Sequence, residues 1–373
     1  MTEAEKYARA VVSGEIIAGK LIVLACEKFL SDLQRTDIVF DVKKGQRAVN
    51  FIERKLCHWE GSWRGKPLKL EAWQKFIVMQ IFGWYKDGVR RINSVYIQIA
   101  RKNGKTSFAA AIGLYHIFGD KENTPQILVG ANNEDQAKIC VNSMRRMIQK
   151  SPEFSDLVDD ETLKLSIYGR NVIGIYHHGK DATVKAMSKN PETQDGFNPS
   201  LGVIDEYHEA KDDALLNVIE SGQGARQEPL LLVVTTAGFD KQGPCYTKLS
   251  KPSIDMLKGV VEDDSHLAFI YEMDEGDDWK DEKMWPKSNP NYGISVFPAY
   301  IRKRLVKAQT QGKTKEVDFK TKNLNMWVDA PTVWIQDETW MNNAYGITLD
   351  DLKGARCYGG LDLASGIDIN AFC

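Results

Sequence analysis

The sequence predicts an α/β fold with a mostly parallel sheet covered by helices on both faces. Between residues 95 and 238, apolar runs typical of buried strands alternate with segments of helical composition. A Gly-Lys-Thr turn follows the first of these strands, and a later strand ends in an Asp-Glu pair. Strand–helix alternation is the pattern of parallel sheets, whose ligands bind at the carboxyl ends of the strands.

The elements can be assigned from this alternation. Strands are predicted at 95–99, 127–131, 172–176, 201–204 and 230–235, and helices at 106–118, 134–149 and 214–221. In the first 34 residues, apolar positions at helical spacing predict two short helices, interrupted by Gly14 and Gly19. After residue 240 the alternation lapses, and one basic helix is predicted at 299–311. A last strand-like segment, 357–364, carries Asp362.

The turn after the first strand has the composition of a phosphate-binding loop. It reads Ala-Arg-Lys-Asn-Gly-Lys-Thr from Ala100 to Thr106. In such loops backbone N–H groups and a helix N-terminus surround the phosphates, the Lys reaches the outer ones and the Thr hydroxyl binds Mg²⁺. Asn103, Gly104, Lys105 and Thr106 are therefore candidate phosphate-binding residues. Ile99 occupies the position of the first Gly of the usual pattern, so a basic surface turn stays open as the alternative.

Two later strands carry residues that complete such a site. Asp205 ends one strand and could hold Mg²⁺, while Glu206 could act as the general base toward water. The strand at 230–235 runs into Thr235 and Thr236, whose hydroxyls could sense the γ-phosphate. Together with the Gly-Lys-Thr turn, these residues predict a nucleoside triphosphatase.

Two further segments contain candidate nucleotide-binding or catalytic residues. Trp73 and Gln74 could stack on and hydrogen-bond an adenine base, or be a core Trp beside a surface Gln. Arg226 lies in a Gly-rich loop and could be an arginine finger, a residue worth about 10³–10⁵ in rate where such fingers operate. A surface Arg in a turn is the alternative interpretation.

Composition restricts the class of protein. The chain has 373 residues, 43% of them hydrophobic and 27% charged, which is typical of a globular protein. Its six Cys lack any Cys-x-x-Cys spacing, which argues against zinc or a disulfide scaffold and fits a reducing cytosol. No apolar run is long enough for a membrane span, and the acidic N-terminus does not resemble a signal peptide.

Charge is distributed unevenly although the net charge is only −2. Residues 301–322 contain eight Lys and Arg against two acids, a local charge of +6, and residues 262–285 contain ten acids against two Lys, a local charge of −8. The two segments could be solvated faces that attract each other. Alternatively, the basic one could be a track for DNA phosphates that the acidic one shields.

These pieces, in this order, resemble the large terminase subunit of tailed bacteriophages, particularly the HK97-like group. The resemblance spans nearly the whole chain and rests on the segments already described together with 15–19, 24–27, 195–199, 224–226 and 360–363. It implies an ATPase that packages double-stranded DNA into a procapsid, with a C-terminal RNase H-like nuclease that cuts concatemeric DNA. It also implies a small terminase subunit, a portal protein, a homo-oligomeric ring and the cytoplasm of a bacterial host.

The resemblance assigns roles to single residues. Lys105 and Thr106 would bind phosphate and Mg²⁺, Asp205 would hold the metal, and Glu206 would be the base. Gln74 resembles the adenine-reading residue and Thr236 the coupling residue. Arg226 is the candidate finger, with Arg101 as its rival. Asp362 resembles the first acid of a nuclease site that binds Mg²⁺ or Mn²⁺, and the chain is expected to lack nuclease activity because the other acids would follow residue 373.

The predicted domains are an N-terminal helical segment at 1–60, a phosphate-loop ATPase domain at 61–255, a linker or lid at 256–354 and the first strand of a nuclease domain at 355–373. Two other functions remain possible. One is a stand-alone metal-dependent nuclease in which the Gly-Lys-Thr turn is only a basic loop, and the other is an inactive assembly protein derived from a prophage.

Overall fold

The computed structural model describes residues 1–328 except 169–170 and 188–195, and the short pieces 350, 353–354, 356, 360–362 and 371–372. The chain forms two units, Met1–Pro331 and Thr332–Cys373. In the second unit, β12 (Leu361–Asp362) pairs antiparallel with β13 (Ala371–Phe372).

An eight-stranded sheet is the centre of the first unit, in the order β11-β4-β10-β9-β5-β8-β7-β6. Neighbouring strands from β11 to β8 are parallel, and β7 and β6 add an antiparallel hairpin. The bounds are β4 Ser94–Gln98, β5 Gln126–Ala131, β6 Leu163–Tyr168, β7 Asn171–His177, β8 Ala182–Ala186, β9 Leu201–Asp205, β10 Leu230–Thr235 and β11 His266–Ile270.

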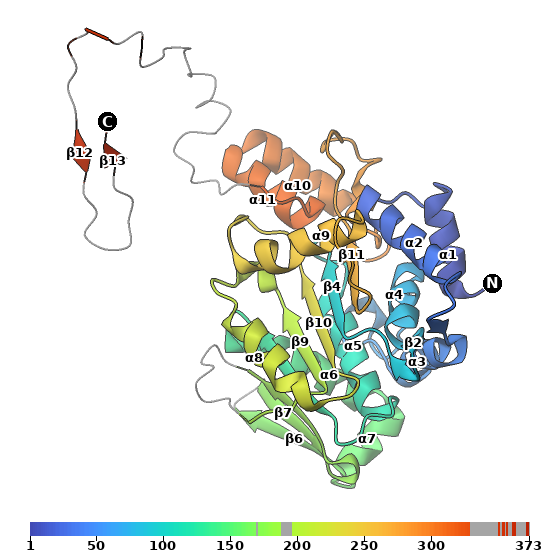
Figure 1. Cartoon of the computed structure of the whole chain (residues 1–373). Coiled ribbons are helices and arrows are strands. Elements are labelled where there is room, and N and C mark those ends of the chain that lie inside the picture. Colours follow the sequence, from blue (N-terminus) through green and yellow to red (C-terminus); the bar gives the residue numbers. More distant parts are fainter. Residues whose placement is uncertain are drawn as a thin grey trace. The chain divides into compact units, whose positions relative to one another are not determined.

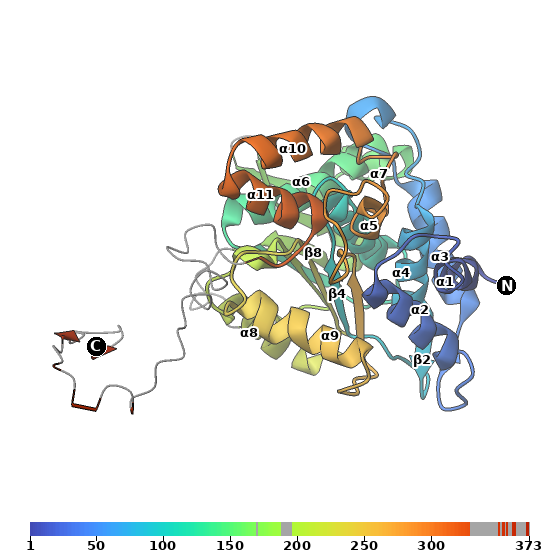
Figure 2. The same ribbon diagram turned by 90° about the horizontal axis from the view of Figure 1, so that it is seen from above.

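Helices cover both faces of this sheet, as predicted (Figures 1 and 2). On one face lie α5 (Lys105–Phe118) and α6 (Glu134–Lys150), with α7 (Pro152–Asp159) beside the β6–β7 hairpin. On the other lie α8 (Ala214–Gly222) and α9 (Lys251–Leu257), preceded by a π-helical turn at Cys245–Ser250. The apolar side chains of β4, β9 and β10 point to both faces and are buried throughout, as expected for central parallel strands.

The N-terminal region packs at the β11 side of the sheet. It consists of α1 (Glu3–Val12), α2 (Lys20–Asp32), α3 (Val42–Lys55) and α4 (Ala72–Gly83), with a small sheet of β1 (Val39–Phe40), β2 (Trp84–Lys86) and β3 (Val89–Arg90). Helix α4 is apolar on nearly all sides because α1 and α3 cover it. The two helices predicted in the first 34 residues are confirmed.

The region after β11 ends in a helical hairpin, α10 (Pro298–Thr310) and α11 (Lys313–Leu324). Its small apolar core includes Trp285, Ile301 and Phe319. The basic helix predicted at 299–311 is α10, and α11 was not predicted.

Three features of the sheet were also not predicted. The strand at 172–176 is β7, which runs antiparallel, and its neighbours β6 and β8 are missing from the predicted elements. The edge strand β11 follows a run of acids and was interpreted as part of an irregular connection.

No helix among the described residues is long and apolar enough to cross a membrane.

Candidate active site

The phosphate-binding loop connects β4 to α5. Gly104 has φ +80°, a left-handed conformation that favours glycine, and it precedes the first residue of α5. Lys102 also has a positive φ, +74°. The loop therefore turns sharply and presents the free N–H groups of the first turn of α5, which can bind an anion.

The loop meets the end of β9. The strand order places β10 between β4 and β9, so the carboxyl ends of all three strands lie at one edge of the sheet. Thr106 Oγ1 donates to Asp205 Oδ2 at 2.7 Å, and Lys105 Nζ lies 3.0 Å from Glu206 Oε1. The four residues line a pocket of about 290 Å³ together with Arg101, Lys102, Gln136, Ile139 and Glu209.

The pKa values of the two carboxylates in this pocket are shifted in opposite directions from their ordinary values. Burial and the neighbouring charge of Glu206 raise the pKa of Asp205 to about 6. Burial also raises the pKa of Glu206, but His208 and Lys105 outweigh it and bring that pKa down to about 2. At neutral pH Glu206 is therefore an ionised base, while Asp205 is the carboxylate that would gain from a nearby cation.

The pocket has the oxygen atoms that a divalent cation needs. Asp205 Oδ1 is buried and has no hydrogen-bond partner, and Thr106 Oγ1 lies beside the same carboxylate. Within the described part of the chain, no cluster of three or more His, Cys, Asp and Glu side chains could hold a metal by itself. Mg²⁺ fits this pocket nonetheless, since it is commonly held by one or two protein groups together with substrate phosphates and water.

His208 connects Glu206 to the end of β10 and is not among the residues predicted from the sequence. Its Nδ1 lies 3.3 Å from Glu206 Oε2, 3.1 Å from Thr235 Oγ1 and 3.3 Å from Thr236 Oγ1. Glu206 has φ +56° and starts the short helix η4 (Tyr207–Glu209), which turns His208 back toward the base. The sequence signal was the position of a His two residues after the Asp-Glu pair.

Arg101 is the arginine at this pocket. Its Nη2 lies 4.0 Å from Glu209 Oε1, and the side chain is 39% exposed. Glu209 in turn accepts a hydrogen bond of 2.9 Å from Gln136 on α6. Among the described residues this guanidinium has one ion-pair partner, at 4.0 Å, so it can be redirected toward a phosphate.

Arg226 is not part of this pocket. It precedes β10 and therefore lies near the amino ends of the strands, at the opposite edge of the sheet. Its guanidinium is held by Glu122 Oε1 at 3.0 Å and by the carbonyls of Asn123, Thr124 and Asn198. Action on a neighbouring subunit would require these bonds to break, so the structure favours Arg101 over Arg226.

Of the two residues predicted to contact adenine, Trp73 and Gln74, only Gln74 is accessible to a ligand. Trp73 is 2% exposed, its Nε1 donates to Asn291 Oδ1 at 2.7 Å, and its ring packs on Phe108 and Tyr271. Trp73 is therefore a core residue, and the interpretation that its ring stacks on an adenine base is wrong. Gln74 is partly exposed, and its Oε1 accepts from the N–H of Glu71, which leaves its amide N–H₂ for a ligand.

Asn103 points away from the phosphate position. Its side chain is fully buried, donating to Asn289 Oδ1 and accepting from the N–H of Asn291. Only its backbone N–H remains for a phosphate, so the predicted contact does not involve the side chain. The buried amide cluster of Asn103, Asn289 and Asn291 instead joins the loop to the segment before α10.

Asp362 lies in β12, but its side chain is outside the described residues. The predicted nuclease role of Asp362 stays a prediction.

The loop follows β4, the acidic pair ends β9, and one additional strand, β10, lies between them. This arrangement defines the additional-strand class of phosphate-loop proteins. Comparison with known families narrows this class. The sequence model of the terminase large subunit, ATPase domain, matches residues 72–252, and that of the terminase large subunit, endonuclease domain, matches residues 260–373. The chain belongs to the terminase large subunit family.

Individual relatives agree with this assignment. The large subunit of the terminase of Enterobacteria phage HK97 is 27% identical over 345 residues, covering 88% of this chain and 61% of the relative. Protein YmfN of Escherichia coli (strain K12) is 39% identical over 178 residues, covering 48% of this chain and 39% of that protein. The crystal structure of the HK97 bacteriophage large terminase has a TM-score of 0.65 at 25% identity, covering 88% of this chain and 64% of that one. The chain thus spans less than two thirds of each relative.

Proposed function

We propose that this chain is the ATP-hydrolysing part of a motor that packages double-stranded DNA into a procapsid. The observation that carries the proposal is the pairing of Lys105 with Glu206 and of Thr106 with Asp205 around one pocket. These are the groups that phosphoryl transfer to water requires: a phosphate-binding cation, metal ligands and a base.

The ion pair of Lys105 and Glu206 suggests how nucleotide binding prepares the base. A phosphate chain in the loop competes for Lys105 and draws its ammonium group away from Glu206. Glu206 then keeps His208 as its partner and can accept a proton from a water molecule at the γ-phosphate. Mg²⁺ bound by Thr106 and Asp205 would neutralise phosphate charge during this step.

The remaining roles extend the same site. The backbone N–H groups of Asn103 and Gly104 would contact phosphate, and Gln74 would hydrogen-bond the adenine. Thr236 would report the loss of the γ-phosphate through His208, which it contacts. Arg101, or Arg226 of a neighbouring subunit, would stabilise the transition state in a homo-oligomeric ring. The small terminase subunit, the portal protein and the host cytoplasm belong to the same proposal.

The helical hairpin is the proposed contact with DNA. Four of its eight basic residues pair with acids: Arg302 with Glu282, Lys313 and Lys320 with Glu316, and Lys322 with Asp318. The other four, Lys303, Arg304, Lys307 and Lys315, form no ion pair with any described residue and are available to phosphates. The C-terminal segment with Asp362 would begin a nuclease site that uses Mg²⁺ or Mn²⁺.

ATP hydrolysis by the purified chain tests the proposal. Lys105→Ala should lower kcat by about 10² or more, because the loop loses its phosphate-binding charge. Lys150→Ala, an exposed residue at the end of α6, is the matched control. An unchanged rate in Lys105→Ala would favour a stand-alone nuclease, and no hydrolysis by the wild-type chain would favour an inactive assembly protein.

A further inference from the structure

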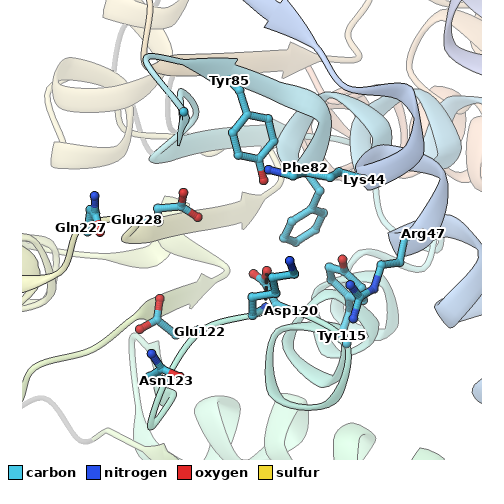
Figure 3. A pocket seen from close by; sticks show the side chains of 13 residues that line it. Lys44, Arg47, Phe82, Tyr85, Tyr115, Asp120, Glu122, Asn123, Gln227 and Glu228 are labelled. Atoms are coloured by element: carbon cyan, nitrogen blue, oxygen red, sulfur yellow. Dashed lines mark hydrogen bonds between the residues drawn. The ribbon is translucent and has the colours of Figure 1, made fainter.

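A second pocket lies at the opposite edge of the sheet from the nucleotide pocket. It has a volume of about 370 Å³, and its walls come from α3, the end of α4, β2, the end of α5, the loop before β5 and the loop before β10 (Figure 3). The amino ends of the parallel strands lie here, so none of its lining residues belongs to the site already described. The size is at the lower end of the range for small-molecule sites.

Two of the three acids that line this pocket, Asp120 and Glu122, pair with cations. Asp120 Oδ2 lies 3.4 Å from Arg90 Nη1 and 3.2 Å from His116 Nδ1. Burial raises the pKa of Asp120, but His116 and Arg90 outweigh it and bring the pKa down to about 2. Glu122 pairs with Arg226 at 3.0 Å, and Glu228 Oε1 accepts a hydrogen bond of 2.9 Å from the N–H of Arg90.

The cations of the pocket are not compensated in this way. Lys44 Nζ lies 3.3 Å from the ring centroid of Tyr85, a cation–π contact that does not neutralise its charge. Lys44, Arg47 and Lys121 form no ion pair with any residue that the structure describes. Among the described residues, the pocket therefore has three cations without an ion pair and one carboxylate, that of Glu228, without a cationic partner.

The hydroxyl of Tyr115 adds a hydrogen-bond donor to the pocket. Tyr115 is 4% exposed and lines the pocket beside Arg47, yet its hydroxyl makes no hydrogen bond to the described residues. Burial raises the pKa of Tyr115, so the hydroxyl stays protonated and is available as a donor.

The rest of the lining suits a planar body attached to the anion. On the side of α3, Tyr85 is partly exposed beside the nearly buried rings of Phe82 and Tyr115, and the amides of Asn123 and Gln227 lie on the facing side (Figure 3). A phosphate alone would leave most of this volume and all of these amides unused.

We propose that this pocket binds a nucleotide: its phosphate at Lys44, Arg47, Lys121 and the Tyr115 hydroxyl, its base against the aromatic rings and the amides. The phosphate can belong to a free mononucleotide or to a DNA strand. The proposal does not depend on ATP hydrolysis.

Calorimetric titration of the chain in Mg²⁺-free buffer tests this site. The probes are 5′-dAMP, adenosine, inorganic phosphate and a short blunt DNA duplex, each with the wild-type chain and with Lys105→Ala. We expect 5′-dAMP to bind equally to both chains and more tightly than adenosine or phosphate. Duplex binding that Arg47→Ala weakens would identify DNA as the source, and binding of 5′-dAMP alone would identify free nucleotides.

Substitutions in the pocket locate the binding. Arg47→Ala should weaken 5′-dAMP binding about tenfold or more, and Tyr115→Phe, which keeps the ring, about fivefold. Lys43→Ala changes an exposed residue of the same helix outside the pocket and should have no effect. Absence of 5′-dAMP binding, equal affinity for adenosine or phosphate, or affinity unchanged in Arg47→Ala would each overturn the proposal.

Discussion

Asp205 and Glu206 are adjacent in the sequence but differ in their protonation, and this difference makes the nucleotide site sensitive to pH. The pKa of Asp205 is about 6, above its ordinary value of 3.8, so in mildly acidic solution a proton occupies the carboxylate that is proposed to bind the metal. Metal binding requires the ionised form. The apparent affinity for Mg²⁺ with nucleotide should therefore fall about tenfold between pH 7 and pH 5.

The measurement is nucleotide binding titrated with Mg²⁺ at each pH. Asp205→Asn should bind weakly at both pH values, and a wild-type affinity independent of pH would contradict the assignment. Stability changes in the same window. The native state retains a proton on Asp205 that the unfolded chain releases, so this residue's contribution to stability falls as pH rises from about 4 to 6.

His208 is expected to position Glu206 rather than to contact substrate. Its removal should lower kcat about tenfold or more, since a contact with a charged group is lost, and leave KM nearly unchanged. Because His208 is the principal group lowering the pKa of Glu206, His208→Ala should also move the acidic limb of the kcat profile to higher pH. His208→Asn retains a donor and should recover part of the rate. A uniform loss at every pH in His208→Ala would indicate a structural role only.

At the scale of elements, the phosphate-binding loop and the helical hairpin are joined by buried hydrogen bonds. Asn291 Nδ2 donates to the carbonyl of Asn103 at 3.1 Å, and the N–H of Arg101 donates to the carbonyl of Lys322 at 3.0 Å. Asn325, which follows α11, accepts from the N–H of Ala237 after β10. The loop and the end of β10 are therefore both hydrogen-bonded to segments that flank or belong to the helical hairpin.

Asn291→Ala tests this connection. The substitution leaves the Trp73 indole N–H and the Asn103 carbonyl without their buried partner, so it should lower the free energy of unfolding by about 1–3 kcal/mol. Ser295→Ala removes an exposed hydrogen bond to the carbonyl of Lys102 and is the control, with a change below about 0.5 kcal/mol. Denaturant unfolding measures both. A similar effect of the two substitutions would show that burial of the amide cluster adds nothing.

The sequence alone was sufficient for the central elements and insufficient for the connections between them. The strands β4, β5, β9 and β10 have apolar interiors, and the residues at their ends carry the chemistry, so both could be predicted. The hairpin β6–β7 and the edge strand β11 have weaker local signals, because the sheet decides their pairing. The role of the Asn103 side chain was hidden for the same reason: its partner Asn289 is 186 residues away.

For the whole molecule, the charge pattern predicts which basic residues would contact DNA in the proposed motor. Four of the eight basic residues of the helical hairpin pair with acids, so the other four are the candidate phosphate contacts. Lys303→Ala with Lys307→Ala should reduce the slope of log affinity against log salt by about 2, if both contact phosphates. Lys313→Ala with Lys320→Ala removes two cations already bound to Glu316 and should change the slope less. Filter binding over a range of salt concentrations distinguishes the two pairs.

Which of the two arginines acts as the finger can be tested in the proposed assembly of several subunits. Arg101 lies at the nucleotide pocket of its own subunit, whereas Arg226 is bound to four residues at the opposite edge. If Arg101 acts within its subunit, mixing Arg101→Ala chains into wild-type assemblies should lower the ATPase rate in proportion to their fraction. A finger acting between subunits should lower it more steeply, since each altered chain also silences its neighbour. A steep loss with Arg226→Ala but not with Arg101→Ala would reverse the assignment, and the Glu122 pairing would then describe a resting state.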